Sequence, residues 1–271
     1  MASVGSNPVR LVSRRAVIAA LCLAAPVWGQ QLTEEQIWER FGEWARGQQD
    51  RTMLPERYRA KLLADGLPQS EVDRRLAVIL DRSSDSRQRR INAFWEKATS
   101  TPGNATFRVT PSEWLVQAVK DVKPGTALDL GMGQGRNSLF LARQGWHVTG
   151  IDISDVAVTQ ARQQAEKLGV KYTATVADID HWDFGIDRWD LIASIFEPDV
   201  KWAGKICRGL KPGGLFVREN AVFETDENAV LKAFLALRIL RYEDRVDTSN
   251  YSPDGAAVMP ERIIRMVAQK V

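Results

Sequence analysis

A glycine-rich turn flanked by a carboxylate is the part of this sequence whose residue types best suit chemistry. The turn reads Gly-Met-Gly-Gln-Gly over residues 131–135, and Asp129 lies just before it. Glycines lack a β-carbon, so their backbone N–H groups can approach a ligand closely. A carboxylate beside such a turn repels a pyrophosphate and attracts a cationic ligand. The pattern therefore predicts a site for a small molecule that carries positive charge.

The turn differs from both common phosphate-binding motifs. The dinucleotide fingerprint needs glycines at its first, third and sixth positions, but the sixth position counted from Gly131 is Arg136. No Gly-Lys-Ser or Gly-Lys-Thr follows, as the phosphate loop of nucleoside triphosphatases requires. A dinucleotide site and a triphosphate site are therefore both disfavoured.

Two more carboxylates follow at the ends of expected strands. Asp152 comes 21 positions after Gly131, where an acid can accept hydrogen bonds from both ribose hydroxyls of a nucleoside. Asp178 closes the next expected strand, where a carboxylate can meet the edge of an adenine ring. Ile153 and Ile179 directly follow these acids and are placed to enclose that ring. Acids at three successive strand ends favour one shared site over separate strand-end caps.

The elements that must position these residues alternate between strand and helix patterns. The first apolar strand covers residues 127–130 and leads through the turn into a helix. Such alternation is typical of an α/β fold of the Rossmann-like, doubly wound type, with helices on both faces of a parallel sheet. The later elements are expected at 137–144 (helix), 147–151 (strand), 155–168 (helix), 172–176 (strand), 190–195 (strand), 202–210 (helix) and 215–219 (strand).

A helical segment precedes this fold. Residues 33–36 form a capping box, and further helices are expected to begin at Pro55 and Pro68. A separate fourth helix is expected around Phe94 and Trp95. These two rings are expected to pack within the helices, with a place at the mouth of the substrate site as the alternative.

The arginines of this segment have acids nearby in the sequence. Arg87, Arg89 and Arg90 are therefore expected to lie on a solvated face. A run rich in Thr, Ser, Pro, Gly and Asn follows, which predicts a joint between domains. We expect a helical extension over residues 30–106 and the α/β domain over residues 107–271.

Five motifs occur in order between residues 107 and 220. They are the segments 129–135, 150–154, 178, 189–192 and 210–214. As a set they resemble the motifs of class I S-adenosylmethionine-dependent methyltransferases, and most of all those of the tellurite-resistance-type small-molecule branch. The resemblance implies a seven-stranded sheet whose last strand is antiparallel. Two strand patterns near the C-terminus, at 239–246 and 262–268, agree with that expectation.

The resemblance also implies that S-adenosyl-L-methionine is the cofactor. The glycines of the turn would border its methionine moiety, and Asp129 would lie near the ammonium group. Asp152 would hold the ribose, and Asp178 with Ile179 would bound the adenine. The complete expected set of cofactor-binding residues is Asp129, Gly131, Gly133, Gln134, Gly135, Asn137, Asp152, Ile153, Asp178 and Ile179.

Methyl transfer from a sulfonium is an in-line displacement, so alignment and exclusion of water can supply most of the catalysis. A base is needed only when the acceptor keeps its proton. Glu197, in a Phe-Glu-Pro-Asp segment after the fourth strand, is the candidate base. This segment departs from the Asn-Pro-Pro-Tyr pattern of amino-methylating relatives, which favours a small-molecule acceptor over a nucleic acid. Tyr251 is a further candidate for acceptor contact.

Two other functions remain open from the sequence. One is noncatalytic binding of S-adenosylmethionine or a nucleoside, and the other is a dinucleotide-dependent oxidoreductase, which Asp129 and Arg136 disfavour. No metal site is expected, because the chain has two histidines, His147 and His181, and Cys207 is the single cysteine after the leader.

The first 29 residues have the layout of a removable export signal. Arg14 and Arg15 precede an apolar run over residues 16–28, and cleavage is expected after Gly29. The Ser-Arg-Arg segment resembles a twin-arginine signal. A helix over the apolar run would rise about 20 Å, short of the roughly 30 Å hydrocarbon core, so no stable membrane anchor is expected after processing. Export to the periplasm is expected, with a cytoplasmic location as the alternative.

The charge balance agrees with a leader that is distinct from the rest of the chain. The protein has 37 basic and 34 acidic side chains, and no acid occurs before Glu34. Arg10, Arg14 and Arg15 account for the excess of positive charge. The remainder is formally neutral, so its net charge does not favour a nucleic-acid partner.

Overall fold

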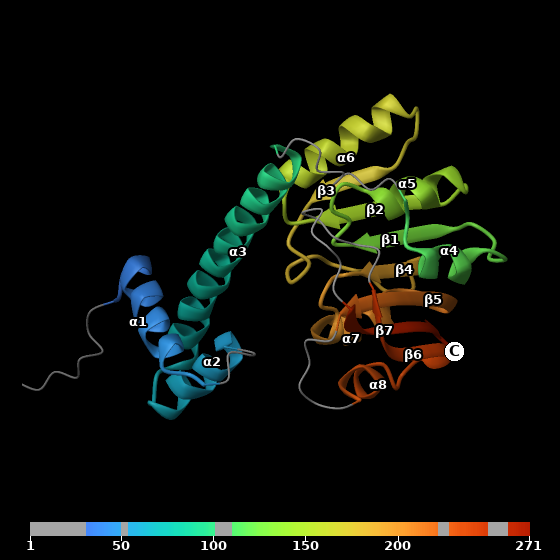
Figure 1. Cartoon of the computed structure of the whole chain (residues 1–271). Helices are drawn as coiled ribbons and strands as arrows, with labels where there is room; N and C mark the ends of the chain where they lie inside the picture. The colour runs from blue at the N-terminus through green and yellow to red at the C-terminus, as the bar shows by residue number, and fades with distance from the viewer. Residues whose placement is uncertain (1–30, 50–53, 101–109, 222–227, 249–259) are drawn as a thin grey trace, which may run out of the picture. The chain divides into compact units, whose positions relative to one another are not determined.

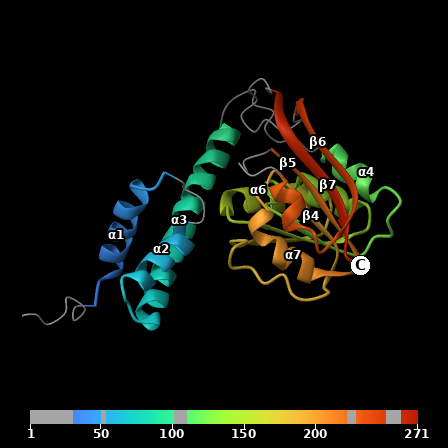
Figure 2. The same ribbon diagram turned by 90° about the horizontal axis from the view of Figure 1, so that it is seen from below.

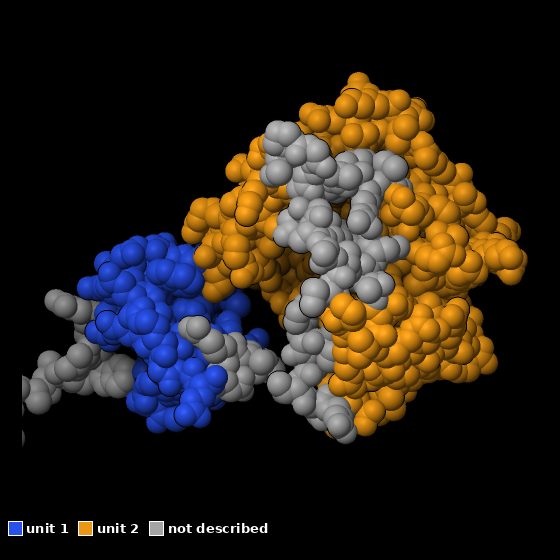
Figure 3. All heavy atoms as spheres, viewed as in Figure 1, with its two compact units in different colours: residues 1–82 blue, residues 83–271 orange. Residues whose placement is uncertain are grey.

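The computed structural model describes residues 31–49, 54–100, 110–221, 228–248 and 260–271. The chain divides into two compact units, residues 1–82 and residues 83–271, which Figure 3 shows in blue and orange. The expected export signal and Tyr251 lie outside the described residues. Within the described ranges, no helix combines the length and the apolar character needed to cross a membrane.

The first unit is built from helices. They are α1 (Glu34–Arg46), α2 (Leu54–Ala64) and the beginning of α3 (Gln69–Ser100). The expected capping box is confirmed, because the Thr33 hydroxyl accepts from the Gln36 N–H and the Gln36 amide oxygen accepts from the Thr33 N–H. The helices enclose a small apolar core of Ile37, Phe41, Tyr58, Leu62, Leu67, Val72 and Ile79.

The expectation of separate third and fourth helices is wrong. Helix α3 is continuous over 32 residues, and its part from Ser83 onward belongs to the second unit. The polar run Ser83–Ser86 contains neither glycine nor proline, so nothing in it breaks the helical backbone. One helix therefore supplies residues to both units.

The second unit contains the expected seven-stranded sheet, with strand order β3-β2-β1-β4-β5-β7-β6 (Figure 1). Strand β7 pairs antiparallel with both β5 and β6, and the other pairings are parallel. The strand order reverses between β1 and β4, which is where ligands bind in open α/β sheets. The bounds are β1 (Thr126–Leu130), β2 (His147–Asp152), β3 (Thr173–Val176), β4 (Trp189–Ile195), β5 (Leu210–Ala221), β6 (Arg238–Thr248) and β7 (Pro260–Gln269).

Helices cover both faces of this twisted sheet (Figure 2). Alternation along β1 separates the two apolar layers, because Leu128 and Leu130 enter one layer and Ala127 enters the other. The first layer contains residues of α7 and α8, and the second contains residues of α4 and α5. The helices are α4 (Glu113–Val119), α5 (Arg136–Arg143), α6 (Asp155–Lys167), the 3₁₀ turn η2 (Val200–Trp202), α7 (Ala203–Gly209) and α8 (Ala229–Ala233).

Candidate active site

The glycine turn joins β1 to α5, and its backbone shape excludes larger residues. Gly131, Gly133 and Gly135 have φ values of 61°, 54° and 83°, in the left-handed region that favours glycine. Space is restricted as well. A β-carbon on Gly131 would lie 2.7 Å from Oε2 of Glu197, and one on Gly133 would lie 2.9 Å from the ring of Trp95. The turn therefore brings its bare backbone against both side chains.

Asp152 fixes the position of this turn from the end of β2. Its side chain is buried, and its two oxygens accept from the N–H groups of Gly133 and Ser154, each at 2.8 Å. Burial raises the pKa of Asp152, although the backbone hydrogen bonds favour the ionised form. The acid predicted to hold the ribose thus organises the backbone of the glycine turn.

Asp129 lies beneath the turn, within the protein. It is 1% exposed and accepts a hydrogen bond from the Ser138 hydroxyl at 2.6 Å. Burial raises its pKa to about 6. Asp129 does not line the cavity described below, and neither does Gly135, which caps the start of α5. Asp129 and Gly135 therefore support the structure of the turn without lining the cavity.

Asp178, after β3, is held by helix α3. Its carboxylate accepts from the Ser84 hydroxyl at 2.6 Å, from the Arg87 guanidinium and from the Asp180 N–H at 3.0 Å. Arg87 also donates to Asp180 at 2.9 Å. The expectation that Arg87 lies on a solvated face is therefore wrong, because this arginine pairs with acids that are distant in sequence.

Asp180 is anchored from its other side. It accepts from Lys201 at 2.7 Å and from the Trp202 indole at 2.6 Å. Burial opposes ionisation of this acid, but the hydrogen bonds from Lys201, Trp202 and Arg87 outweigh burial and lower its pKa to about 2. Asp180 is therefore a fixed negative anchor.

A cavity of about 590 Å³ opens at the carboxyl ends of β1, β2, β3 and β4. This volume lies within the usual range for small-molecule sites. Eight predicted residues line it: Gly131, Gly133, Gln134, Asn137, Asp152, Ile153, Asp178 and Ile179. Phe94 and Trp95 line it too, and Trp95 also packs against Ala98 and Ala157. The cavity is also lined by residues that the sequence patterns do not predict, among them Arg87, Arg90, Ile91, Lys201 and Trp202.

Glu197 stands at the end of β4, facing the turn. The backbone here is tightly bent, since Phe196 has a φ of 63° and the carbonyl of Glu197 accepts from Asn220 at 2.9 Å. Burial of the carboxyl group, and then the nearby charge of Asp152, raise the pKa of Glu197 to about 8. Glu197 can therefore exchange a proton near neutral pH within the cavity.

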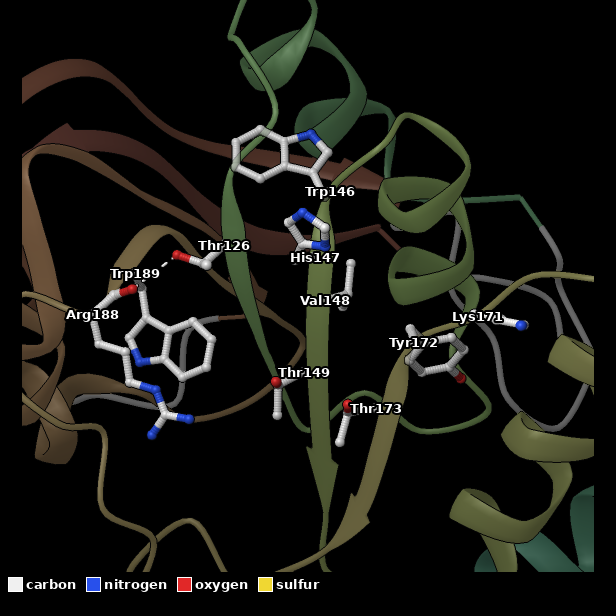
Figure 4. Close-up of a pocket in the computed structure, with 10 residues that line it drawn as sticks. All are labelled: Thr126, Trp146, His147, Val148, Thr149, Lys171, Tyr172, Thr173, Arg188 and Trp189. Carbon is white, nitrogen blue, oxygen red and sulfur yellow. Dashed lines mark hydrogen bonds between the residues drawn. The ribbon is translucent and has the colours of Figure 1, made fainter.

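A second hollow lies at the opposite edge of the sheet (Figure 4). Its lining residues lie at or near the amino ends of the strands and include His147, Lys171 and Arg188, but no carboxylate. Lys171 and Arg188 lie on opposite sides of His147 and Val148 in Figure 4. Ligands of parallel sheets bind at the carboxyl ends, so this hollow is the poorer candidate.

Part of the chain is similar to known proteins. Residues 127–214 match the family model described as a methyltransferase domain. The ubiquinone biosynthesis O-methyltransferase of Paramagnetospirillum magneticum is 39% identical over 97 residues, which cover 34% of this chain and 39% of that protein. The probable S-adenosyl-L-methionine-dependent methyltransferase TehB of Haemophilus influenzae is 36% identical over 80 residues, covering 30% of this chain and 28% of that protein. The chain thus spans well under half the length of either relative.

Solved structures show the same fold. The crystal structure of TehB from Haemophilus influenzae matches with a TM-score of 0.52 and 22% identity, covering 58% of this chain and 61% of that one. Magnesium protoporphyrin IX methyltransferase from Synechocystis, with bound SAH, also gives a TM-score of 0.52, at 17% identity, covering 69% and 99%. These structures share the fold of the second unit. The family match over residues 127–214, with the sheet order and the glycine turn, shows that the chain carries a class I S-adenosylmethionine-dependent methyltransferase domain.

Proposed function

We propose that this protein transfers a methyl group from S-adenosyl-L-methionine to a small-molecule acceptor by in-line displacement. The observation that carries the proposal is the cavity at the strand ends, where buried Asp152 is bonded to the backbone of a glycine turn with no room for side chains. Asp152 and Asp178 bring carboxylates to this cavity, which suit the ribose hydroxyls and the positive groups of the cofactor. Basic side chains line the cavity as well, namely Arg87, Arg90, Arg136 and Lys201. The residues present therefore fit this cofactor.

The residues of the cavity would divide the work of holding the cofactor. Asp152 would accept from the ribose hydroxyls, while Ile153 and Ile179 would flank the adenine and Asp178 would meet its edge. The bound cofactor would supply a methyl group already activated on sulfur. The Trp95 ring over the glycine turn would exclude water from the reacting groups. Catalysis would then rest mainly on alignment.

Glu197 would serve as the base for an acceptor that loses a proton. Its pKa of about 8 lies near physiological pH, where a general base works best. Its carboxylate lies against Gly131, on the side of the turn that faces the cavity. An acceptor hydroxyl or thiol in contact with Glu197 could pass its proton to the carboxylate as the methyl group arrives.

A small acceptor is supported by the names of relatives and by the lining of the cavity. The matches include the ubiquinone biosynthesis O-methyltransferase and a probable thiol methyltransferase of Arabidopsis thaliana, the latter 29% identical over 146 residues. Phe94, Trp95 and Phe196 give the cavity an aromatic wall, which suits an acceptor with an apolar or ring-shaped part.

A second function uses the cofactor without methyl transfer. It is favoured by a match to a protein named S-adenosyl-L-methionine-dependent Diels-Alderase, from Neonectria, which is 36% identical over 126 residues and covers 45% of this chain and 49% of that protein. In this alternative the same cavity binds the cofactor, and Glu197 in its protonated form donates a hydrogen bond to another ligand.

One experiment separates these functions. Purified protein is incubated with S-adenosylmethionine labelled at the methyl group and with a pool of small phenols, thiols and carboxylic acids, and products are followed by mass spectrometry. The main proposal expects label in a small molecule together with stoichiometric S-adenosylhomocysteine. Tight cofactor binding with no label transferred to any acceptor class would favour the second function. Binding of a nicotinamide dinucleotide in place of S-adenosylmethionine would favour an oxidoreductase.

The leader supports a further proposal about location. Residues 1–29 would direct export through the twin-arginine route, which carries folded proteins and could carry the protein with its cofactor. Cell fractionation followed by intact-mass measurement tests this, since an exported protein should begin at Gln30. A cytoplasmic protein that retains its leader would contradict it.

A further inference from the structure

Helix α3 reaches the cofactor-binding region with one of its faces. Ser84, Arg87, Ile91 and Trp95 follow one another at intervals of three or four residues, so they share a side of the helix. Arg87, Ile91 and Trp95 line the cavity. Ser84 and Arg87 bond to Asp178, and the Trp95 ring lies against Gly133. The second half of α3 therefore forms one wall of the cavity.

The contact at Asp178 leaves room for one more donor. An ionised carboxylate offers about four lone-pair positions. Ser84, Arg87 and the Asp180 N–H occupy three of them. The Asp178 side chain is only 10% exposed, and the nearest further polar group is Nδ1 of His181, 3.5 Å from Oδ2 of Asp178. One exocyclic amino group of an adenine would complete this set without displacing α3.

Arg87 also contacts Asp180, whose side chain is fixed by other residues. Arg87 donates to Asp180, which Lys201 and Trp202 fix through hydrogen bonds of their own. Further along α3, the Asn92 amide oxygen accepts from the Ser154 hydroxyl at 2.6 Å. Helix α3 is thus tied to the loop after β3 and to the loop after β2.

We propose that Arg87 and Ser84 are positioning residues that clasp α3 over the bound cofactor, so that the cofactor leaves only when the Arg87 ion pair with Asp178 and Asp180 opens. This inference rests on the proposed cofactor site. Arg87 acts through Asp178, by aiming its carboxylate at the adenine edge, and through α3, by holding the cavity wall in place. The clasp slows cofactor release and makes release sensitive to salt, because screening weakens a partly exposed ion pair.

The test measures the release of S-adenosylhomocysteine by stopped-flow displacement, using intrinsic tryptophan fluorescence, with affinity from calorimetry. Arg87→Gln removes the charge, and Arg87→Lys keeps the charge but not the forked geometry. Ser84→Ala removes only the hydrogen bond from Ser84 to Asp178. This smaller change provides the test if Arg87→Gln does not fold. Arg89→Gln is the matched control, because Arg89 is exposed on the same helix and does not line the cavity.

If the clasp exists, S-adenosylhomocysteine should leave Arg87→Gln roughly tenfold faster than the parent, or more. This is the effect expected from the loss of one charge-assisted hydrogen bond. Arg87→Lys should recover part of the change, Ser84→Ala should show a smaller effect, and Arg89→Gln should match the parent. Added salt should speed release from the parent but not from Arg87→Gln. Purely structural damage would not remove this salt dependence.

Two results would overturn the clasp. In one, the parent binds S-adenosylhomocysteine, but Arg87→Gln releases it within twofold of the parental rate. In the other, Arg87→Gln binds it more tightly, which would mean that Arg87 competes with the adenine. A parent protein that binds no S-adenosylhomocysteine would instead refute the proposed function as well, so the two failures are distinguishable.

Discussion

Replacing Asp152 with alanine should abolish most of the affinity for the cofactor. The side chain is buried, and its oxygens accept two backbone hydrogen bonds at 2.8 Å, from Gly133 and Ser154. Hydrogen bonds to a charged group contribute about 1.5–3 kcal/mol each. Alanine removes the acceptors for the ribose hydroxyls and also frees the N–H that holds the glycine turn. We therefore expect a loss of about 3 kcal/mol or more, roughly a hundredfold rise in Kd.

Calorimetric titration with S-adenosylhomocysteine measures this change. Asp152→Asn should lie between the parent and alanine, because the amide keeps one acceptor oxygen. Glu166→Ala, an exposed acid on α6, serves as the control and should bind like the parent. Circular dichroism confirms that each variant is folded. Correctly folded Asp152→Ala with a Kd within twofold of the parent would refute the assignment of the ribose to this carboxylate.

Three further predictions concern the turn, the candidate base and a buried ion pair. Gly133→Ala should lose cofactor binding, because its β-carbon would meet the Trp95 ring. Gly169 has a similar positive φ but no atom within 4 Å of an added β-carbon, so Gly169→Ala should bind the cofactor and lose only about 1 kcal/mol of stability. Equal cofactor affinities of the two variants in calorimetry would contradict this. The pKa of Glu197 is about 8 in the folded protein against an ordinary 4.5, so protonation of this group stabilises the fold. The free energy of unfolding in urea should therefore fall as the pH rises from 4.5 to about 8, and it should fall less in Glu197→Gln. An equal fall in the parent and in Glu197→Gln would refute the raised pKa. Asp199→Ala should cost about 3–5 kcal/mol in urea unfolding by stranding Arg218, which is 0% exposed, and a loss under about 1 kcal/mol would count against it.

The sheet and the glycine site could be predicted because local patterns determine them. Strand β2 ends in Asp152 and β3 is followed by Asp178. Because the carboxyl ends of parallel strands meet at one edge of the sheet, these two acids converge there. The same reasoning placed Asp129 near the ligand. Strand alternation directs its side chain toward α5, where the Ser138 hydroxyl donates to it under the turn, and the proximity of Asp129 to a ligand stays a prediction.

The contribution of α3 could not be predicted in this way. Arg87 has acids near it in sequence, so a solvated face was the natural expectation. Its actual partner, Asp178, lies 91 positions away, and no periodic pattern encodes such a contact. The polar run Ser83–Ser86 also interrupts the apolar pattern of α3, so one continuous helix was predicted as two. The aromatic pair Phe94 and Trp95, directly before a domain joint, was the one available signal.

A cocrystal structure with S-adenosylhomocysteine tests the central claim most directly. We expect density for S-adenosylhomocysteine in the cavity at the carboxyl ends of β1 to β4. The ribose hydroxyls should donate to Asp152, the adenine should lie between Ile153 and Ile179, and its amino group should donate to Asp178. The methionine part should lie along the glycine turn. Density for the ligand elsewhere, such as the hollow beside Lys171 at the opposite edge of the sheet, would contradict the assignment of this site.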